Sequence, residues 1–197
     1  DVALIFNSDL PSEYPVAGNS IRKGVNFHGT KLIIANPRNV IFDSEANIDI
    51  RLRLNVGTDL VVANRICKII IDRNLVDLGK VKAAVPNYDQ LAQSLNAYTA
   101  EYAKTVAGID DAALNQAAEQ FAGKADRFIL IGNDVLVNAQ GEDVLNALLN
   151  LSILVHTGGE GYVSIYPPRE HCNSQGANDM GVTPEFLPGY QSVQDSK

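Results

Sequence analysis

The sequence has little of what metal and nucleic-acid sites usually require. Its two cysteines, Cys67 and Cys172, are far apart and outside any C-x-x-C pair, so the chain offers too few thiolates for a zinc or iron–sulfur site. Lys and Arg number 16 against 23 Asp and Glu, and no basic cluster is present to neutralise nucleic-acid phosphates. We therefore expect no metal site in this chain alone and no nucleic-acid partner. Two isolated cysteines also suit a reducing cytoplasm.

Long hydrophobic runs are absent too. The longest, around Ile69–Ile71 and Leu148–Val155, are interrupted by polar residues and fall far short of a bilayer span of about 20 residues. The first residues, DVALIF, contain no initiator Met and no basic leader, which suggests a piece of a longer polypeptide. We expect a cytoplasmic location without direct membrane insertion.

The common signatures of nucleotide binding and nucleophilic catalysis are missing. No G-x-G-x-x-G follows the first apolar run, and neither a G-x-x-x-x-G-K-[ST] loop nor a G-x-S-x-G elbow occurs. Cys172 directly follows His171, and neighbouring residues have poor geometry for a nucleophile and its base. These motifs therefore give no reason to expect catalysis by this chain alone.

What is present is an alternation of strand-like and helix-like segments. Apolar runs of strand length occupy 2–6, 31–35 and 127–131, and 48–54 alternates as a half-exposed strand near a sheet edge. Helical spacing covers 15–27, 60–74, 88–106, 110–122 and 142–155. We predict an α/β, Rossmann-like fold with a mostly parallel sheet, helices on both faces and a helical excursion. Residues 1–160 would form this domain and residues 161–197 an irregular C-terminal segment.

Each predicted strand ends in small or polar residues. The three ends are Asn7-Ser8-Asp9, Asn36-Pro37-Arg38 and Gly132-Asn133-Asp134. In parallel α/β sheets ligands bind at the carboxyl ends of the strands, so these residues are candidates for a binding site. The same residue types are ordinary turn formers, and both interpretations stay open at this point.

The run PPREHCNSQGANDMG, residues 167–181, with PGYQ at 188–191, resembles the N-x-Q-G-x-x-D-M-G signature of the molybdopterin oxidoreductases. FNSDLPSEYPV, ANPR, VGTDLVVANRICKIIIDRNLVD and AGIDDAALNQAAEQFA are similar to that family's first strand end, its D-P-R segment and two of its helices. Within the family, the sequence looks most like formate dehydrogenase catalytic subunits and the large G subunit of NADH dehydrogenase (complex I). The resemblance spans nearly the whole chain and implies an oxidoreductase subunit that assembles with other subunits, through which any attachment to the inner membrane would be made.

The resemblance implies a domain that holds one half of a bis-molybdopterin guanine dinucleotide carrying Mo or W. The candidate cofactor-binding residues are then Asp9, Asn36, Arg38, Asp59, Asn133, Arg169, Gln175 and Asp179, and Arg169 is also the catalytic candidate. The family's iron–sulfur segment and its catalytic Cys or selenocysteine precede this region. The isolated chain is therefore expected to hold no cofactor and to be inactive, whereas the pterin and iron–sulfur clusters are cofactors for the full-length protein.

The sequence departs from the family pattern at three strand-end positions, and the family's R-G-Q-N is replaced by REHC at 169–172, which keeps only the arginine. Asn7 replaces a glycine, and its Cβ would obstruct a pyrophosphate approaching the backbone. Asn36 replaces the Asp of D-P-R and would lose a charge-assisted hydrogen bond to guanine, at a cost on the order of 1–3 kcal/mol. Asp134 adds a negative charge beside the expected phosphates.

These departures favour a fragment of the large G subunit of respiratory NADH dehydrogenase, with an eroded cofactor site and a structural role in electron transfer. Asn173, Gln175, Asp179 and Gly181 would then tie the last loop to the sheet through buried hydrogen bonds. The alternative is the pterin-binding domain of a formate dehydrogenase catalytic subunit. A third possibility, a free-standing nucleotide-binding protein, predicts that this chain binds a guanine nucleotide or NAD, and we expect no such binding.

Overall fold

The computed structural model describes residues 1–45, 48–123, 126–169, 171–187 and 189–194. They divide into two compact units, Asp1–Pro167 and Pro168–Lys197. The first unit contains the sheet and its helices, and the second contains the signature run.

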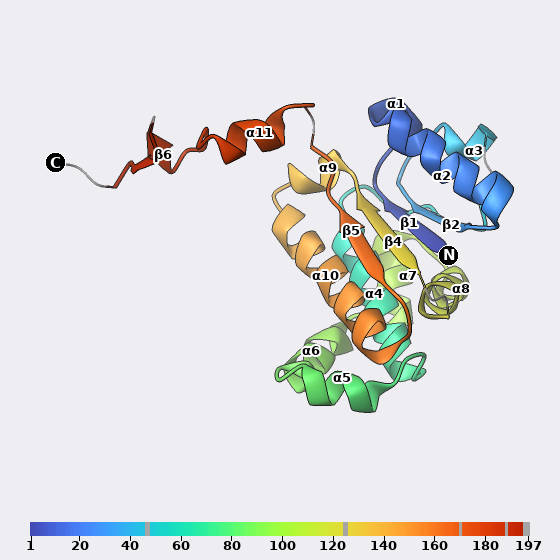
Figure 1. Ribbon diagram of the computed structural model, residues 1–197. Helices are drawn as coiled ribbons and strands as arrows, with labels where there is room; N and C mark the ends of the chain where they lie inside the picture. Colours follow the sequence, from blue (N-terminus) through green and yellow to red (C-terminus); the bar gives the residue numbers. More distant parts are fainter. Residues whose placement is uncertain (46–47, 124–125, 170, 188, 195–197) are drawn as a thin grey trace. The chain divides into compact units, whose positions relative to one another are not determined.

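The first unit is built on a five-stranded parallel sheet (Figure 1). Its strands are β1 (Val2–Phe6), β2 (Lys31–Ala35), β3 (Ile50–Leu52), β4 (Arg127–Ile131) and β5 (Val163–Tyr166). They lie in the order β3-β2-β1-β4-β5, and every neighbouring pair is parallel. The predicted Rossmann-like α/β fold is confirmed, and β3 is an edge strand as its alternating pattern indicated.

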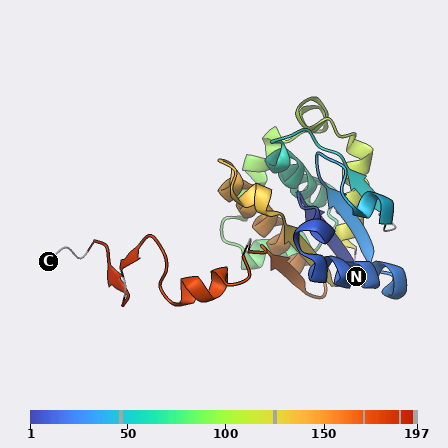
Figure 2. The ribbon, with the colours of Figure 1, turned by 90° about the horizontal axis from the view of Figure 1, so that it is seen from above.

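Helices cover both faces of the sheet, which is why the central strands are continuous apolar runs. One face carries α1 (Leu10–Glu13), α2 (Pro15–His28) and α3 (Phe42–Glu45). The other carries α4 (Asp59–Asp72), α8 (Asp111–Ala122) and α10 (Gly141–Gly158). Figure 2 shows α2 running along one side of the strands, away from α4 and α10. All five residues of β1 are buried because both faces are covered.

Gly29 ends α2 as its sequence pattern indicated. Its φ of 68° is left-handed, and its N–H donates to the carbonyl oxygen of Gly24. The chain then turns directly into β2, whose first residue is Lys31. Strand β1, helix α2 and strand β2 thus form a βαβ unit.

The helical excursion differs from the single helix predicted over 88–106. It consists of α5 (Leu78–Ala84), α6 (Tyr88–Ser94), the short 3₁₀ helix η1 (Leu95–Ala97) and α7 (Ala100–Ala107). Thr99 begins a new helix, because its side-chain oxygen accepts the N–H of Tyr102 at 3.1 Å. Asp77 caps α5 in the same way, accepting the N–H groups of Gly79 and Lys80. The Thr99 cap divides the segment that hydrophobic spacing alone had joined, and α5 lies outside the predicted helices.

Strand β5 was missed because its sequence, VSIY, is short and only half buried. It pairs with β4, so residues 163–166 belong to the sheet and not to an irregular C-terminal segment. The compact unit accordingly extends to Pro167, past the predicted boundary at residue 160.

Arg127 joins three segments at the amino end of β4. Its side chain is almost fully buried, and its guanidinium donates to the carbonyl oxygens of Phe121, Ala122 and Glu160, each at 2.7 Å. Burial lowers the pKa of this guanidinium, and the nearby Asp126 carboxylate opposes that shift. The side chain thereby connects the end of α8, the start of β4 and the segment that leads into β5.

The C-terminal unit contains α11 (Ser174–Asp179) and the antiparallel pair β6 (Phe186–Leu187) and β7 (Gln191–Ser192). Gly181 has a φ of 79° and lies against the ring of Tyr190. A Cβ at this glycine would come within 3.1 Å of that ring, so both conformation and space favour glycine here. Glu170 and Pro188, two residues of the signature segments, lie outside the described residues.

A search of the described residues found no helix both long enough and apolar enough to cross a membrane.

Candidate functional site at the carboxyl edge of the sheet

The strand order reverses direction between β1 and β4. From β1 the chain proceeds to β2 and β3 on one side, and from β4 to β5 on the other. In open α/β sheets the crevice at such a switch point, outside the carboxyl ends of the strands, is where ligands bind. Here the corresponding position lies between residues 7–9 after β1 and residues 132–134 after β4, and it is called the crevice below.

Gly132 allows the two central strand ends to approach each other closely. Its N–H donates to the carbonyl oxygen of Phe6 at 2.7 Å, and a Cβ built on it would lie 1.8 Å from the carbonyl oxygen of Asn7. Any larger residue would therefore displace the backbone of the switch point. The glycine at this strand end is a steric requirement of the crevice itself.

Asn7 adopts the left-handed conformation that favours glycine, with a φ of 52°. Its side chain donates a hydrogen bond that lowers the pKa of the Asp59 carboxyl group. The residue that replaces the family's glycine thus keeps a glycine-like backbone and engages the start of α4.

Asp59 is the first residue of α4 and carries a buried acceptor. Its side chain is 5% exposed, and Oδ1 has no hydrogen-bond partner. Burial raises the pKa of this carboxyl group, and the negative charge of Asp134 raises it further, while its own backbone N–H and Asn7 oppose the shift. Thr58 occupies the preceding cap position, but its hydroxyl donates to the carbonyl oxygen of Asn55 instead of capping the helix.

The raised pKa of Asp59 should make the fold less stable as pH rises. The folded state holds this proton more tightly than the unfolded chain, so stability falls between the ordinary Asp pKa near 4 and the higher folded pKa. Asp59→Asn should therefore have a higher Tm than the wild type at pH 7, and the difference should shrink towards pH 4. Differential scanning calorimetry at both pH values measures it. A difference that grows on acidification would contradict this assignment.

Asn36 places a second unpaired polar atom at this edge. Its side chain is fully buried, Oδ1 accepts the N–H of Arg38 at 3.0 Å, and Nδ2 has no partner. The oxygen expected to accept from a ligand is therefore used within the turn, and the free atom is a donor. A buried amide donor costs free energy until an oxygen accepts from it, so carbonyl, hydroxyl or phosphate oxygens suit this position.

Arg38 and Asp134 form an ion pair between the ends of two strands. Arg38 follows β2, Asp134 follows β4, and Nη2 of the arginine lies 2.7 Å from Oδ2 of the aspartate. The carbonyl oxygen of Arg38 accepts from the guanidinium of Arg51, which also binds Asp43. The added negative charge of Asp134 is thus matched by a cation of the same crevice.

Asp9 and Asn133 complete the predicted residues of this edge. An Asp9 carboxylate oxygen accepts the N–H of Ile41 at 2.9 Å, which links the segments that follow β1 and β2. Asn133 opens the short helix α9 (Asn133–Leu136), and its carbonyl oxygen accepts the N–H of Val137. Five of the eight predicted cofactor-binding residues therefore gather at one edge: Asp9, Asn36, Arg38, Asp59 and Asn133.

The other three predicted residues lie in the C-terminal unit. The guanidinium of Arg169 donates to Gln175 Oε1 at 3.4 Å, and Gln175 Nε2 donates to Asp179 Oδ1 at 2.7 Å. These side chains form a series of contacts within their own unit. That Asn173, Gln175, Asp179 and Gly181 hold this segment against the sheet stays a prediction.

Sequence reasoning missed the role of Arg51. The alternating pattern of β3 placed it with the solvent-facing residues, yet its guanidinium also donates to the carbonyl oxygen of Asn36 at 3.1 Å. It thereby fixes the turn that carries Asn36 and Arg38. The available signal was a basic residue on an edge strand beside a turn whose carbonyl groups need donors. This signal predicts a contact between the arginine and the turn only once the strand order is known.

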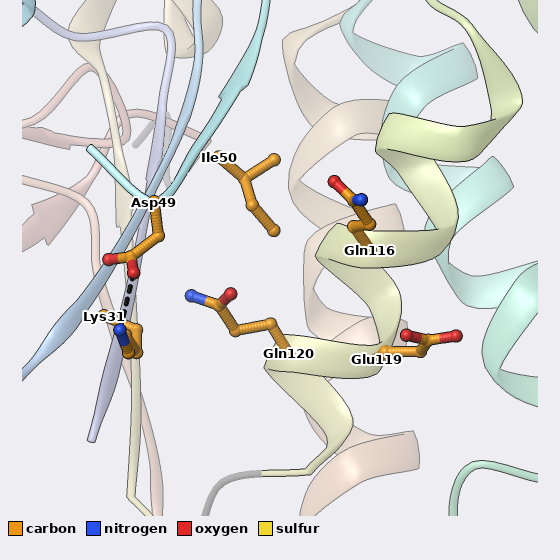
Figure 3. A pocket seen from close by; sticks show the side chains of 6 residues that line it. All are labelled: Lys31, Asp49, Ile50, Gln116, Glu119 and Gln120. Carbon is orange, nitrogen blue, oxygen red and sulfur yellow. Dashed lines mark hydrogen bonds and ion pairs between the residues drawn. The ribbon is translucent and has the colours of Figure 1, made fainter.

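A separate pocket lies at the opposite edge of the sheet (Figure 3). It is lined by Lys31, Asp49, Ile50, Gln116, Glu119 and Gln120. Lys31 and Ile50 begin β2 and β3, so this pocket is at the amino-terminal edge. Figure 3 shows the Gln120 amide directed towards the ion pair of Lys31 and Asp49. It does not belong to the crevice at the switch point.

The cysteines provide no reactive thiolate in the core. Burial raises the pKa of Cys67 to about 12, and its thiol lies 3.7 Å from the carbonyl oxygen of Ala147. Cys172 is exposed in the C-terminal unit. Within the described ranges, no group of three or more His, Cys, Asp or Glu side chains is arranged to hold a metal ion.

Comparison with known proteins agrees with the resemblance seen in the sequence. The family model for molybdopterin oxidoreductases matches residues 1–197. The F420-dependent formate dehydrogenase subunit alpha of Methanocaldococcus jannaschii is 30% identical over 195 residues, which cover 99% of this chain and 28% of that protein. Formate dehydrogenase H of Escherichia coli is 27% identical over 195 residues, covering 99% and 27%. The chain thus spans somewhat over a quarter of these relatives.

Among solved structures, acetylene hydratase from Pelobacter acetylenicus matches with a TM-score of 0.71 and 22% identity. The match covers 79% of this chain and 21% of that one. At this level of identity the likeness establishes the fold.

Proposed function

Because this chain belongs to the molybdopterin oxidoreductase family, we propose that the carboxyl edge of its sheet binds one of the two guanosine parts of a bis-molybdopterin guanine dinucleotide. The chain would do so as part of a formate dehydrogenase-type catalytic subunit. The observation that carries the proposal is the pair of buried, unpartnered polar atoms at this edge, Asp59 Oδ1 and Asn36 Nδ2. Buried polar atoms without partners are rare in folded proteins and are explained by a water, an ion or a ligand.

The chemistry of these atoms fits such a nucleotide. Asp59 Oδ1 accepts hydrogen bonds, as the N–H groups of a guanine or the hydroxyl groups of a ribose require. Asn36 Nδ2 donates, and the carbonyl and phosphate oxygens of the nucleotide are acceptors. Arg38 adds a guanidinium suited to phosphate, and the amino end of α4 contributes its partial positive charge.

In such a protein the cofactor supplies the metal centre at which electrons are exchanged with the substrate. The residues of this chain bind and orient it, and the buried surroundings of Asp59 keep water from that part of the crevice. The isolated chain is inactive in this account, since the iron–sulfur segment and the metal-ligating Cys or selenocysteine belong to other parts of the full polypeptide. Partner subunits in the cytoplasm pass the electrons on.

A second candidate function is a cofactor-free domain of the kind found in the large G subunit of NADH dehydrogenase. The specific observation in its favour is the Arg38–Asp134 pair, which occupies the cation that phosphates would need. We place it second because the relatives described above are formate dehydrogenases, and because a purely structural role leaves the unpartnered Asp59 Oδ1 unexplained.

The experiment that tests the proposal uses the full-length protein. We expect it to purify with Mo or W and to release guanine nucleotide on acid hydrolysis, measured by elemental analysis and chromatography. A folded protein with intact iron–sulfur clusters but neither metal nor guanine would favour the cofactor-free domain instead.

A further inference from the structure

The ion pair between Arg38 and Asp134 crosses the crevice at the switch point. The two residues are 96 positions apart in the sequence, and each lies three residues beyond its strand. Strands β2 and β4 both pair with β1, one on each side. Because neighbouring strands are spaced about 4.8 Å apart, their ends are separated by roughly 10 Å, and these two side chains meet across the end of β1.

The pair is open to solvent. The side chain of Arg38 is 61% exposed and that of Asp134 is 55% exposed. Exposed ion pairs bind weakly and are screened by salt, so an anionic ligand can displace the aspartate from the arginine. Nothing in this contact requires the surrounding fold to rearrange.

Asp134 also affects the rest of the crevice. Its charge adds to the effect of burial in raising the pKa of Asp59, which places the two carboxyl groups within electrostatic reach of each other. A phosphate entering this space would meet the repulsion of Asp134 and would find its guanidinium partner already engaged. Asparagine at the same position would relieve both effects while keeping nearly the same shape.

We propose that Asp134 is an internal competitor for Arg38 that sets the affinity of this crevice for the phosphates of a guanosine nucleotide. The inference rests on the proposed nucleotide-binding function. The aspartate carboxylate takes the place of a phosphate on the arginine, and the nucleotide must displace it to bind. The aspartate lowers the affinity of the crevice for the nucleotide, and it makes the empty crevice bind free phosphate ions poorly.

The test is titration of GDP into the cofactor-free form of the full-length protein and its Asp134→Asn variant by calorimetry at low ionic strength. We expect Asp134→Asn to bind GDP about 3- to 10-fold more tightly than the wild type, since one exposed ion pair and one repulsive charge are removed. The control is Asp72→Asn, which makes the same change in net charge on an exposed aspartate paired with Lys68. This control should leave the GDP affinity at the wild-type value.

A second pair of variants separates competition from general repulsion. In an Arg38→Gln background, adding Asp134→Asn should give a clearly smaller gain, because the competed cation is gone and only the repulsion of the aspartate is relieved. A gain of the same size with and without Arg38 would overturn the proposal, and so would an Asp134→Asn variant that binds GDP no better than Asp72→Asn or not at all. The proposed function is tested separately, by the metal and guanine content of the full-length protein. A negative result for Asp134 therefore does not decide the proposed function.

Discussion

Replacing Arg127 by methionine should lower the free energy of unfolding by about 3–5 kcal/mol. The guanidinium is buried and donates to three carbonyl oxygens, two at the end of α8 and one before β5. Methionine fills a similar volume but leaves these carbonyl groups without that donor, and each buried acceptor left unpaired costs about 1–3 kcal/mol. Urea denaturation followed by circular dichroism measures the change.

The matched control is Arg73→Met. That arginine is 44% exposed and pairs with Glu119 on the surface, so its removal should cost under about 1 kcal/mol. If both variants lose the same stability, the bracing role of Arg127 is wrong.

Gly132→Ala should destabilise the fold by about 3 kcal/mol or more, although only one methyl group is added. The new Cβ would lie 1.8 Å from the carbonyl oxygen and 2.5 Å from the carbonyl carbon of Asn7, and backbone atoms of two hydrogen-bonded strand ends cannot move aside cheaply. The φ of Gly132 is −63°, so the effect is steric and involves no backbone strain. Because Asn7 contacts Asp59, the variant should also weaken nucleotide binding.

Gly79→Ala serves as the control for this change. Its Cβ would meet only Oδ1 of Asp77, at 3.1 Å, and this side-chain oxygen needs to give way only slightly, so it can still cap α5. Chemical denaturation should show a change within about 1 kcal/mol for Gly79→Ala. A Gly132→Ala variant as stable as Gly79→Ala would mean that the strand ends are farther apart than described.

The central sheet could be predicted because burial on both faces leaves a clear signal. The apolar runs at 2–6, 31–35 and 127–131 have the same bounds as β1, β2 and β4. Their polar ends identified the carboxyl edge before any geometry was known. Strand β5 left no comparable signal, since a half-buried edge strand of four residues looks like a loop.

The details of the site depend on contacts between distant residues, and the sequence alone did not reveal them. Asp134 was interpreted as an unbalanced negative charge, because its partner Arg38 lies 96 positions away. Asn36 was compared with an aspartate as a ligand acceptor, whereas its oxygen is used by the turn and its amide is the free group. Asn7 was expected to obstruct the crevice, and its left-handed backbone and contact with Asp59 became apparent only in the fold.

The family was identified from short motifs, and the choice within the family was harder. Substitutions at residues 7, 36 and 134 favoured the large G subunit of NADH dehydrogenase because each was judged unfavourable for cofactor binding. The structure gives two of them partners inside the crevice and leaves a donor free at the third. Together with the formate dehydrogenase relatives, the unpartnered atoms of Asp59 and Asn36 lead us to favour a working nucleotide site.

The most direct test of this account is the guanine content of the full-length protein with and without Asp59. We expect the wild type and the Asp72→Ala control to release guanine nucleotide in proportion to bound Mo or W. Asp59→Ala should retain about a tenth of it or less, since a lost charge-assisted hydrogen bond weakens binding about tenfold or more. Equal guanine content in Asp59→Ala and Asp72→Ala, or a folded wild type that contains none, would contradict the account.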